Sequence, residues 1–235
     1  AGIAGESGKL SGEQFPSSST PSPVSALVQI TGGKYTAGIA AVNSGTVRRC
    51  TNGGAVSGAQ YVGGVCGQNR GSETAAALVE DCVNTGMIRA TGYMLGGIVG
   101  DNDGYSDDFA KTTVRRCANS GHIIGTAAIL RAYVGGAVGR NNGTVNGLYN
   151  TGCVESLGGC VGGALGLNLT KAVKADIYNV ADVMGGDYED DGYPTDNAVS
   201  TEAELAQAKK TMGTVIDRLG SKPAISGTVT PTGKT

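Results

Sequence analysis

Residues 96–104 read GGIVGDNDG and residues 135–143 read GGAVGRNNG, so one pattern, GGxxGxNxG, occurs twice. Aligning the chain with itself at offsets of 26 to 39 residues adds copies at 63–71 and 162–168 and a degenerate one at 37–45. In all five copies the second glycine precedes the asparagine by five positions: Gly38 and Asn43, Gly64 and Asn69, Gly97 and Asn102, Gly136 and Asn141, Gly163 and Asn168. This constant spacing indicates an internal repeat.

A second pattern, V-x-x-C-x-N-x-G, follows each copy of the first, with Leu or Ile also at the Cys place. Its copies are Val47-Cys50-Asn52-Gly54, Val79-Cys82-Asn84-Gly86, Val114-Cys117-Asn119-Gly121, Val145-Leu148-Asn150-Gly152 and Ala175-Ile177-Asn179. From the first-pattern Asn to the Cys place the separations are 7, 13, 15, 7 and 9 residues. The segments between the patterns are therefore predicted to be corners that tolerate insertions.

Short β-branched runs bounded by Gly and Asn favour strands and turns. A repeat unit of roughly 30 residues cannot bury its own apolar face, so the units are expected to stack. Parallel crossovers are nearly always right-handed. We therefore predict an all-β chain: a right-handed parallel β-solenoid (β-helix) of about five to six coils with one C-terminal α-helix. Its two asparagine columns are expected to form hydrogen-bonded ladders.

Composition excludes several protein classes. The 235 residues include 41 Gly, only 16% charged residues and no Trp, which is unlike an ordinary globular enzyme. The net charge of −2 offers no basic face for phosphates, so we expect no nucleic-acid partner. The apolar stretches are too short for a spanning helix, which predicts no membrane insertion.

The segments GGIVGDNDG, GGAVGRNNG and VRRCANSGHIIG resemble the GLUG-motif repeats of bacterial surface and secreted proteins. The resemblance covers roughly residues 35–180, with Ile, Val or Ala where that family often has Leu. Similar repeats accompany immunoglobulin A1 proteases outside the catalytic domain. The resemblance implies an extracellular location at the bacterial cell surface and an adhesin-like role.

We expect four segments along the chain. Residues 1–34 comprise a partial first coil and a Ser/Pro-rich excursion, and residues 35–185 form the solenoid. Residues 186–222 hold an acidic loop and a capping helix. Residues 223–235 resemble a linker or the start of a following Ig-like domain, which implies a larger multidomain parent protein.

The helix is expected between Thr201 and Leu219. Thr201 and Glu204 form a capping-box signature, and Gly220 is a stop signal. An apolar stripe should cover the end or side of the solenoid and comprises Leu205, Met212, Val215, Ile216 and Leu219.

Two acidic clusters invite a calcium interpretation because carboxylates at alternate positions can surround a hard cation. The first is Asp101 and Asp103, followed by Asp107 and Asp108; the second comprises Asp187, Glu189, Asp190 and Asp191. Residues 101–104 align with residues 68–71 and 140–143, which are corners of other coils. We therefore favour solvated corners and predict no metal or cofactor.

Cysteines and the single histidine are interpreted as structural. Cys50, Cys82 and Cys117 share a column with Leu148 and Ile177, and Cys66 aligns with Val99, Val138 and Leu165, which indicates core positions. Cys153 and Cys160 are the most plausible disulfide pair, although neighbouring side chains in a column suit bridging poorly. His122 aligns with Ala55, Met87 and Cys153 and is predicted to be a column residue.

Opposite charges align on three successive coils as Arg48-Arg49, Glu80-Asp81 and Arg115-Arg116. We predict an exposed ion ladder that fixes register, in which each contact contributes about 0.2 to 1 kcal/mol.

Insertions in solenoids often gather on one face and form the binding surface. The two longest corners lie on adjacent coils and place aromatic residues beside charges. The candidate ligand-binding residues are Arg70, Glu73, Tyr105, Asp107, Asp108, Phe109 and Lys111. The alternative is that these corners are solvent loops without a ligand.

The expected function is a surface-displayed module without catalysis, for adhesion or for binding a glycan or host protein, or a structural spacer. The alternative is a carbohydrate-active β-helix of the polysaccharide lyase or hydrolase type, which needs an acid and a base or nucleophile flanking the sugar. The acids are expected on corners without a basic cluster, so no catalytic residue is predicted.

Overall fold

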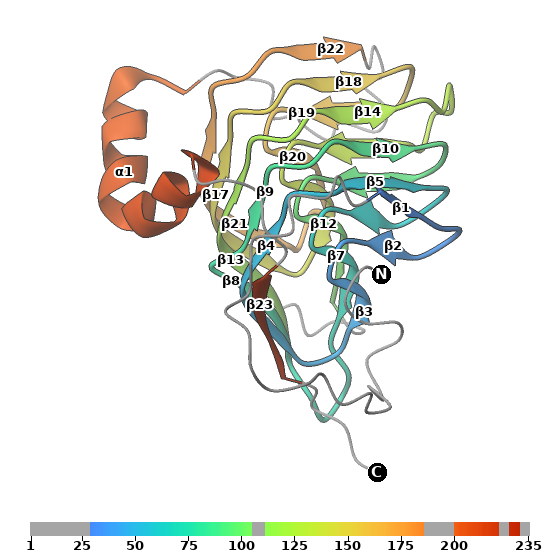
Figure 1. Cartoon of the computed structure of the whole chain (residues 1–235), viewed down its shortest axis with the longest axis horizontal. Coiled ribbons are helices and arrows are strands. Elements are labelled where there is room, and N and C mark those ends of the chain that lie inside the picture. Colours follow the sequence, from blue (N-terminus) through green and yellow to red (C-terminus); the bar gives the residue numbers. More distant parts are fainter. Residues whose placement is uncertain (1–28, 105–110, 186–199, 221–225, 231–235) are drawn as a thin grey trace, which may run out of the picture.

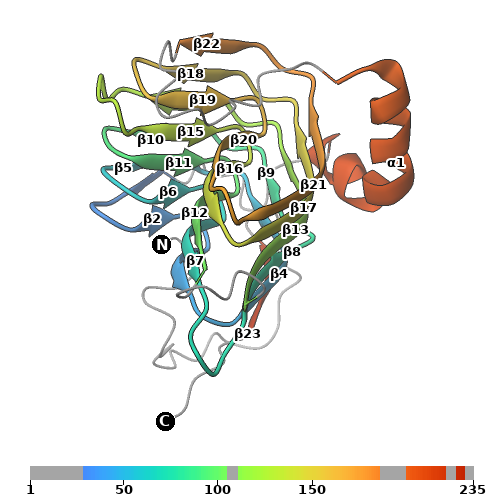
Figure 2. The same ribbon diagram turned by 180° about the vertical axis from the view of Figure 1, so that it is seen from behind.

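The structure is a computed structural model that describes residues 29–104, 111–185 and 200–220 and the strand at 226–230. The chain coils through four parallel sheets, numbered here I to IV in the order in which each coil visits them (Figures 1 and 2). This confirms the predicted parallel β-solenoid. From the first strand of sheet I to the last, the chain makes about four full turns, slightly fewer than predicted.

Sheets I and II carry the first sequence pattern. Sheet I comprises β2 (Thr36–Ala37), β6 (Val62–Gly63), β11 (Met94–Gly96), β15 (Tyr133–Gly135) and β19 (Cys160–Gly162). Sheet II comprises β3 (Ala40–Asn43), β7 (Cys66–Arg70), β12 (Val99–Asp103), β16 (Val138–Asn142) and β20 (Leu165–Asn168).

Sheets III and IV carry the second pattern. Sheet III comprises β4 (Thr46–Asn52), β8 (Ala77–Glu80), β9 (Val83–Asn84), β13 (Thr112–Asn119), β17 (Thr144–Asn150) and β21 (Val173–Asn179). Sheet IV comprises β1 (Gln29–Thr31), β5 (Ala55–Gly58), β10 (Ile88–Ala90), β14 (Ile123–Gly125), β18 (Val154–Ser156) and β22 (Val183–Gly185). Because β1 pairs with β5, the described chain begins with the last strand of a preceding coil.

Two apolar clusters fill each coil. One is formed mainly by sheets II and III and contains the columns of Cys50, Cys82 and Cys117 and of Cys66. The other lies between sheets I and IV and is built mainly from Val, Ile and Leu. The predicted core positions of these four cysteines are confirmed, since all four are fully buried.

The two predicted asparagine ladders are present. In the first, each side-chain amide donates to the next side-chain oxygen at 2.7–2.8 Å, through Asn43, Asn69, Asn102, Asn141 and Asn168. In the second, the distances are 2.7–2.9 Å, through Asn52, Asn84, Asn119, Asn150 and Asn179. The ladders bind each coil to its neighbours through buried polar groups.

The register of the last coil corrects one alignment. The sequence analysis placed Ala175 in the Val column, but Val145 pairs with Lys174, and Ala175 pairs with Asn146. The Cys place at Ile177 and the ladder place at Asn179 are as predicted. Lys174 is exposed, so this position on the last coil does not require an apolar side chain.

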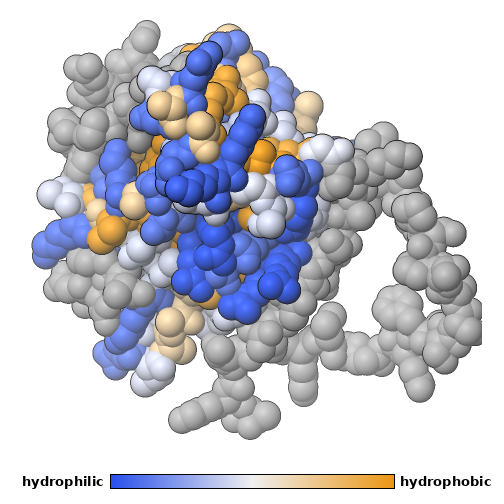
Figure 3. All heavy atoms as spheres, turned by 90° about the vertical axis from the view of Figure 1, so that its left-hand side faces the viewer, coloured by the Kyte–Doolittle hydropathy of each residue, from blue (hydrophilic) through white to orange (hydrophobic). Residues whose placement is uncertain are grey.

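The predicted helix is confirmed as α1 (Glu202–Ile216), followed by the 3₁₀ helix η2 (Asp217–Gly220). Thr201 caps it, and Thr201 and Glu204 form the complete capping box. The helix lies against the outer side of sheet III, where the predicted stripe packs on Val83, Ala118, Tyr149 and Tyr178. Its opposite side is mostly hydrophilic (Figure 3). Within the described residues, no helix is both long and apolar enough to span a membrane.

After the helix, strand β23 (Ser226–Thr230) pairs antiparallel with β4 at the edge of sheet III (Figure 1). Of residues 223–235, which were predicted to be a linker or the start of an Ig-like domain, the structure describes 226–230, and these form an edge strand of sheet III.

Candidate functional site

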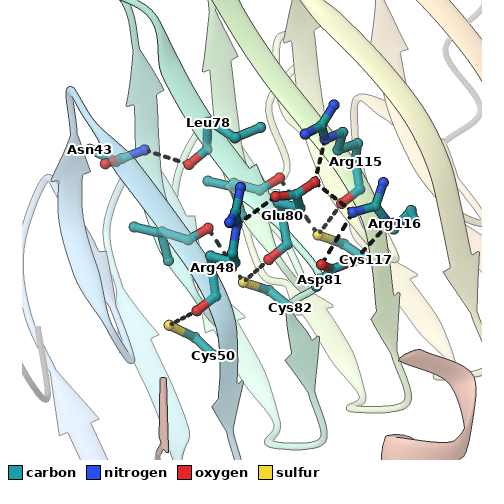
Figure 4. Close-up of polar contacts among 12 residues, drawn as sticks. Asn43, Arg48, Cys50, Leu78, Glu80, Asp81, Cys82, Arg115, Arg116 and Cys117 are labelled. Atoms are coloured by element: carbon teal, nitrogen blue, oxygen red, sulfur yellow. Dashed lines mark hydrogen bonds and ion pairs between the residues drawn. The ribbon is translucent and has the colours of Figure 1, made fainter. Parts of the chain in front are cut away.

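The first group of interest is a charged cluster on the outer face of sheet III that joins three coils (Figure 4). The Glu80 carboxylate lies 2.6 Å from the Nε atoms of both Arg48 and Arg115 and 2.5 Å from Nη2 of Arg116. Arg116 Nε also lies 2.7 Å from Asp81 Oδ1. The predicted ion ladder across these coils is confirmed.

The backbone explains how two consecutive arginines reach one carboxylate. Successive side chains of a regular strand point to opposite faces. Arg116 has a φ of 48°, and Arg49, Asp81 and Asp176 at the same place on other coils have φ of 53–54°. This left-handed residue interrupts the alternation in sheet III, so that the Arg115 and Arg116 side chains both contact Glu80.

The solvent exposure of Glu80 differs from the prediction. The ladder was expected to be exposed, but the Glu80 side chain is only 3% exposed because the three half-exposed guanidinium groups cover it. Burial by itself raises the pKa of Glu80, but the hydrogen bonds and charges of Arg115 and Arg116 outweigh burial and lower the pKa below its ordinary value of 4.5. Glu80 is therefore ionised at neutral pH and holds three coils together.

Glu80→Gln is expected to lower the free energy of unfolding at neutral pH by about 1–2 kcal/mol, since the arginines lose a charged partner but regain water. A lowered folded-state pKa stabilises the native state above the ordinary pKa, and this contribution is lost as pH falls through the folded-state pKa. The difference between variant and parent should therefore shrink on acidification. Urea unfolding at neutral and acidic pH measures it.

The matched control is Glu202→Gln, at an exposed position in the first turn of α1. A Glu80 variant that differs from the parent equally at both pH values would contradict the assigned ionisation.

A second charged group lies on sheet II, where register aligns Gln68, Asp101 and Arg140 on successive coils. Arg140 binds both Asp101 oxygens, with Nε–Oδ1 at 2.7 Å and Nη2–Oδ2 at 2.9 Å, and Gln68 Nε2 donates to Oδ2 at 3.0 Å. This is the strong bidentate form of a carboxylate pair.

The solvated-corner interpretation of Asp101 is therefore wrong. Asp101 and Asp103 belong to strand β12, and the Asp101 side chain is fully buried. The expectation that these acids lack a basic partner is also wrong, because their neighbours in register include Arg140 and Arg70. Since Arg140 and Gln68 use both Asp101 oxygens, the arrangement disfavours calcium there.

Asp103 lies at the end of the same strand. Burial, together with the Asp101 charge, raises its pKa above the ordinary value, although Arg140 and Arg70 oppose the shift. Arg70 Nε lies 3.6 Å from Asp103 Oδ2, and Arg70 is itself exposed. Sheet II thus carries a buried ion pair, Asp101 with Arg140, close to the exposed Arg70 at the start of one long corner.

The structure brings together three of the predicted ligand-binding residues. Arg70 and Glu73 belong to one long corner, and Lys111 ends the other, with its Nζ donating to the Glu73 carbonyl at 2.8 Å. The two corners also meet where Gly71 N donates to Thr112 Oγ1 at 3.2 Å. Tyr105, Asp107, Asp108 and Phe109 lie outside the described residues, as do Asp187, Glu189, Asp190 and Asp191.

The cysteines hold no disulfide in the structure. All six are thiols, and Cys153 precedes β18 in sheet IV whereas Cys160 begins β19 in sheet I. Cys153 is half-buried, and the other five are buried.

A cluster around His122 was not predicted from the sequence. His122 Nε2 lies 2.8 Å from Glu155 Oε1, and the ligand atoms of His122, Glu155 and Cys153 all lie within 4.8 Å of one another. An open groove of about 380 Å³ shares Glu155 and runs across β14, β18 and β22, lined by Ile124, Gly125, Thr126, Ser156, Leu157, Met184 and Gly185. The signal was the alignment of His122 with Cys153, to which Glu155 adds a donor two residues later.

No protein-family model matches the chain, and no curated protein or solved structure is significantly similar to it. The resemblance to GLUG-motif repeats thus stays a prediction from the motifs.

Proposed function

We propose that this chain is a non-catalytic binding module of an extracellular bacterial surface protein, and that it recognises a glycan or a protein through the two long corners. The observation that carries the proposal is the contact between those corners. Lys111 of one corner donates to the Glu73 carbonyl of the other, so the corners of consecutive coils are in direct contact. Insertions gathered on one face are typical of solenoid binding surfaces.

The use of the other charges supports a non-catalytic role. Glu80 and Asp101 are buried and paired with arginines of neighbouring coils. In the described part of the chain, every buried side-chain nitrogen or oxygen has a hydrogen-bond partner. These groups stabilise the stack, whereas Arg70 is exposed and Lys111 is half-buried on the corners, where both charges can contact a ligand.

The location is part of the proposal and rests on the motifs. The resemblance to GLUG-motif repeats supports display at the bacterial surface within a larger multidomain protein. A spacer without a ligand is the other outcome that the experiment below distinguishes.

The test is an array of glycans and extracellular-matrix proteins probed with the purified chain, with and without calcium. Specific binding is expected, and Arg70→Ala with Lys111→Ala should reduce it about tenfold or more because charged groups at a binding surface contribute at this level. Tyr105→Ala with Phe109→Ala tests the aromatic residues of the corner that Lys111 ends.

The matched control is Lys209→Ala with Lys210→Ala, at exposed positions of α1. An array without specific binding, or binding that all corner variants retain, would contradict the proposal and favour a spacer.

One observation favours the carbohydrate-active alternative. Asp101 and Asp103 lie on a strand face beside two arginines, and the raised pKa of Asp103 suits a general acid. Asp101, however, is fully buried and paired. Incubation with a panel of acidic and neutral polysaccharides, followed by assays for reducing ends and unsaturated products, tests this role. Activity that Asp103→Asn abolishes would replace the binding proposal.

A further inference from the structure

Three different metal-binding side chains converge on the outer face of sheet IV. Register pairs Ile123 with Val154, so the preceding residues, His122 and Cys153, lie on neighbouring coils of one column. Glu155 follows Cys153 by two positions and therefore points to the same face. The three ligand atoms lie within 4.8 Å of one another, and all three residues are half-buried, so that an ion has access from solvent.

We propose that His122, Cys153 and Glu155 form a binding site for one zinc ion. Imidazole nitrogen, thiolate sulfur and carboxylate oxygen are the ligands that zinc uses in proteins, at about 2.0–2.3 Å. A tetrahedral ion with such bonds holds its ligand atoms roughly 3.2–3.8 Å apart. In the cluster His122 Nε2 and Glu155 Oε1 are 2.8 Å apart and all three ligand atoms lie within 4.8 Å of one another, so each distance differs from the zinc spacing by at most about 1 Å.

The cysteine distinguishes this position from the rest of the solenoid. Zinc requires a thiolate, and burial raises the pKa of Cys66 and of Cys82 in the core columns. Cys153 is half-buried instead and lies beside a histidine and a carboxylate. Zinc binding would replace the thiol proton of Cys153 and the hydrogen bond between His122 and Glu155, and it would cross-link two coils.

Three protein ligands leave a fourth position of the ion open to water or to an external donor. The groove across β14, β18 and β22 adjoins the cluster at Glu155. A carboxylate or imidazole of a partner bound there would lie next to the ion. The site thus goes beyond the corner surface of the proposed function and is independent of it.

The test uses the full chain, freed of any histidine tag, reduced, stripped with a chelator and titrated with Zn²⁺ by calorimetry. One ion per chain is expected. Titration with Co²⁺ should show the charge-transfer absorption of a thiolate ligand. Cys153→Ser should weaken zinc binding about 100-fold or more and remove that absorption, and His122→Gln and Glu155→Gln should each weaken binding at least about tenfold.

Cys160→Ser is the matched thiol control and should leave zinc binding unchanged, because Cys160 lies in sheet I. Circular dichroism checks that each variant is folded, and the two half-exposed positions His122 and Glu155 keep the test valid if Cys153→Ser does not fold. Absence of zinc binding in the parent chain, or binding that all three ligand variants retain, would overturn the proposal.

Discussion

Gly136→Ala is expected to lower the free energy of unfolding by about 4 kcal/mol or more, the largest effect expected of a single substitution in this chain. A Cβ at Gly136 would overlap the backbone oxygen of Gly163 and the side chain of Asn150, which belongs to a buried ladder. Neither neighbour can move without displacing a coil. Soluble yield and urea unfolding followed by circular dichroism measure the effect.

The chain offers an internal control in Gly213→Ala. Gly213 lies inside α1, and a Cβ there would meet nothing within 4 Å. This substitution is expected to stabilise the protein by about 0.5–1 kcal/mol, because alanine loses less conformational entropy in a helix. If both variants changed stability equally, close packing between coils would not be the reason for the glycine column.

Asn119→Ala is expected to lower the free energy of unfolding by about 3–4 kcal/mol. The Asn119 amide donates to Asn150 Oδ1 at 2.8 Å and to Gly121 O at 2.9 Å, and its oxygen accepts from Asn84 Nδ2 at 2.7 Å and from Gly121 N at 3.1 Å. Alanine would remove all four hydrogen bonds. Asn84 Nδ2 keeps Gly86 O and Asn150 Oδ1 keeps Gly152 N, but the buried N–H and C=O of Gly121 lose the side chain that satisfies them, each at a cost of about 1–3 kcal/mol before relaxation. Urea unfolding again provides the measurement.

The control for this prediction is Asn146→Ala, at an exposed position of strand β17. A change within about 0.5 kcal/mol is expected there. A similarly small change for Asn119→Ala would show that water or a shifted coil satisfies the ladder, and that the ladder contributes little to stability.

The repeat spacing predicted strand register well because each column places one residue type at one position of the coil. Asn102 pairs with Asn69 and Asn141, and Cys82 lies in the column of Cys117, as the alignment indicated. The alignment failed at Ala175, in the last coil of the described residues, where the exposed Lys174 takes the place of the buried valine.

The candidate sites were harder to predict because they depend on where a side chain lies within the cross-section of the coil. Asp101 was predicted on a solvated corner because it aligns with Gln68 and Arg140, which were taken to be corner positions, yet Arg140 one coil away buries it. Glu80 was expected to be exposed because its ion ladder lies on the outside of the solenoid, but the arginines cover its carboxylate. The cluster of His122, Cys153 and Glu155 combines three residue types that do not repeat, so the repeated residues did not indicate it, and its one sequence signal was the alignment of His122 with Cys153.

The position of the C-terminal segment has a mechanical consequence. A stack of coils that contact only their neighbours can unfold from either end, one coil at a time. Here α1 lies across β13, β17 and β21, while Arg218 of η2 donates to the backbone oxygens of Cys50 and Asp81, and β23 pairs with β4. One continuous segment therefore spans early and late coils along the stacking axis. A pulling force that separates the coils must first detach α1, η2 and β23 from the coils that they contact. We therefore expect the solenoid to unfold under force in one step and not one coil at a time.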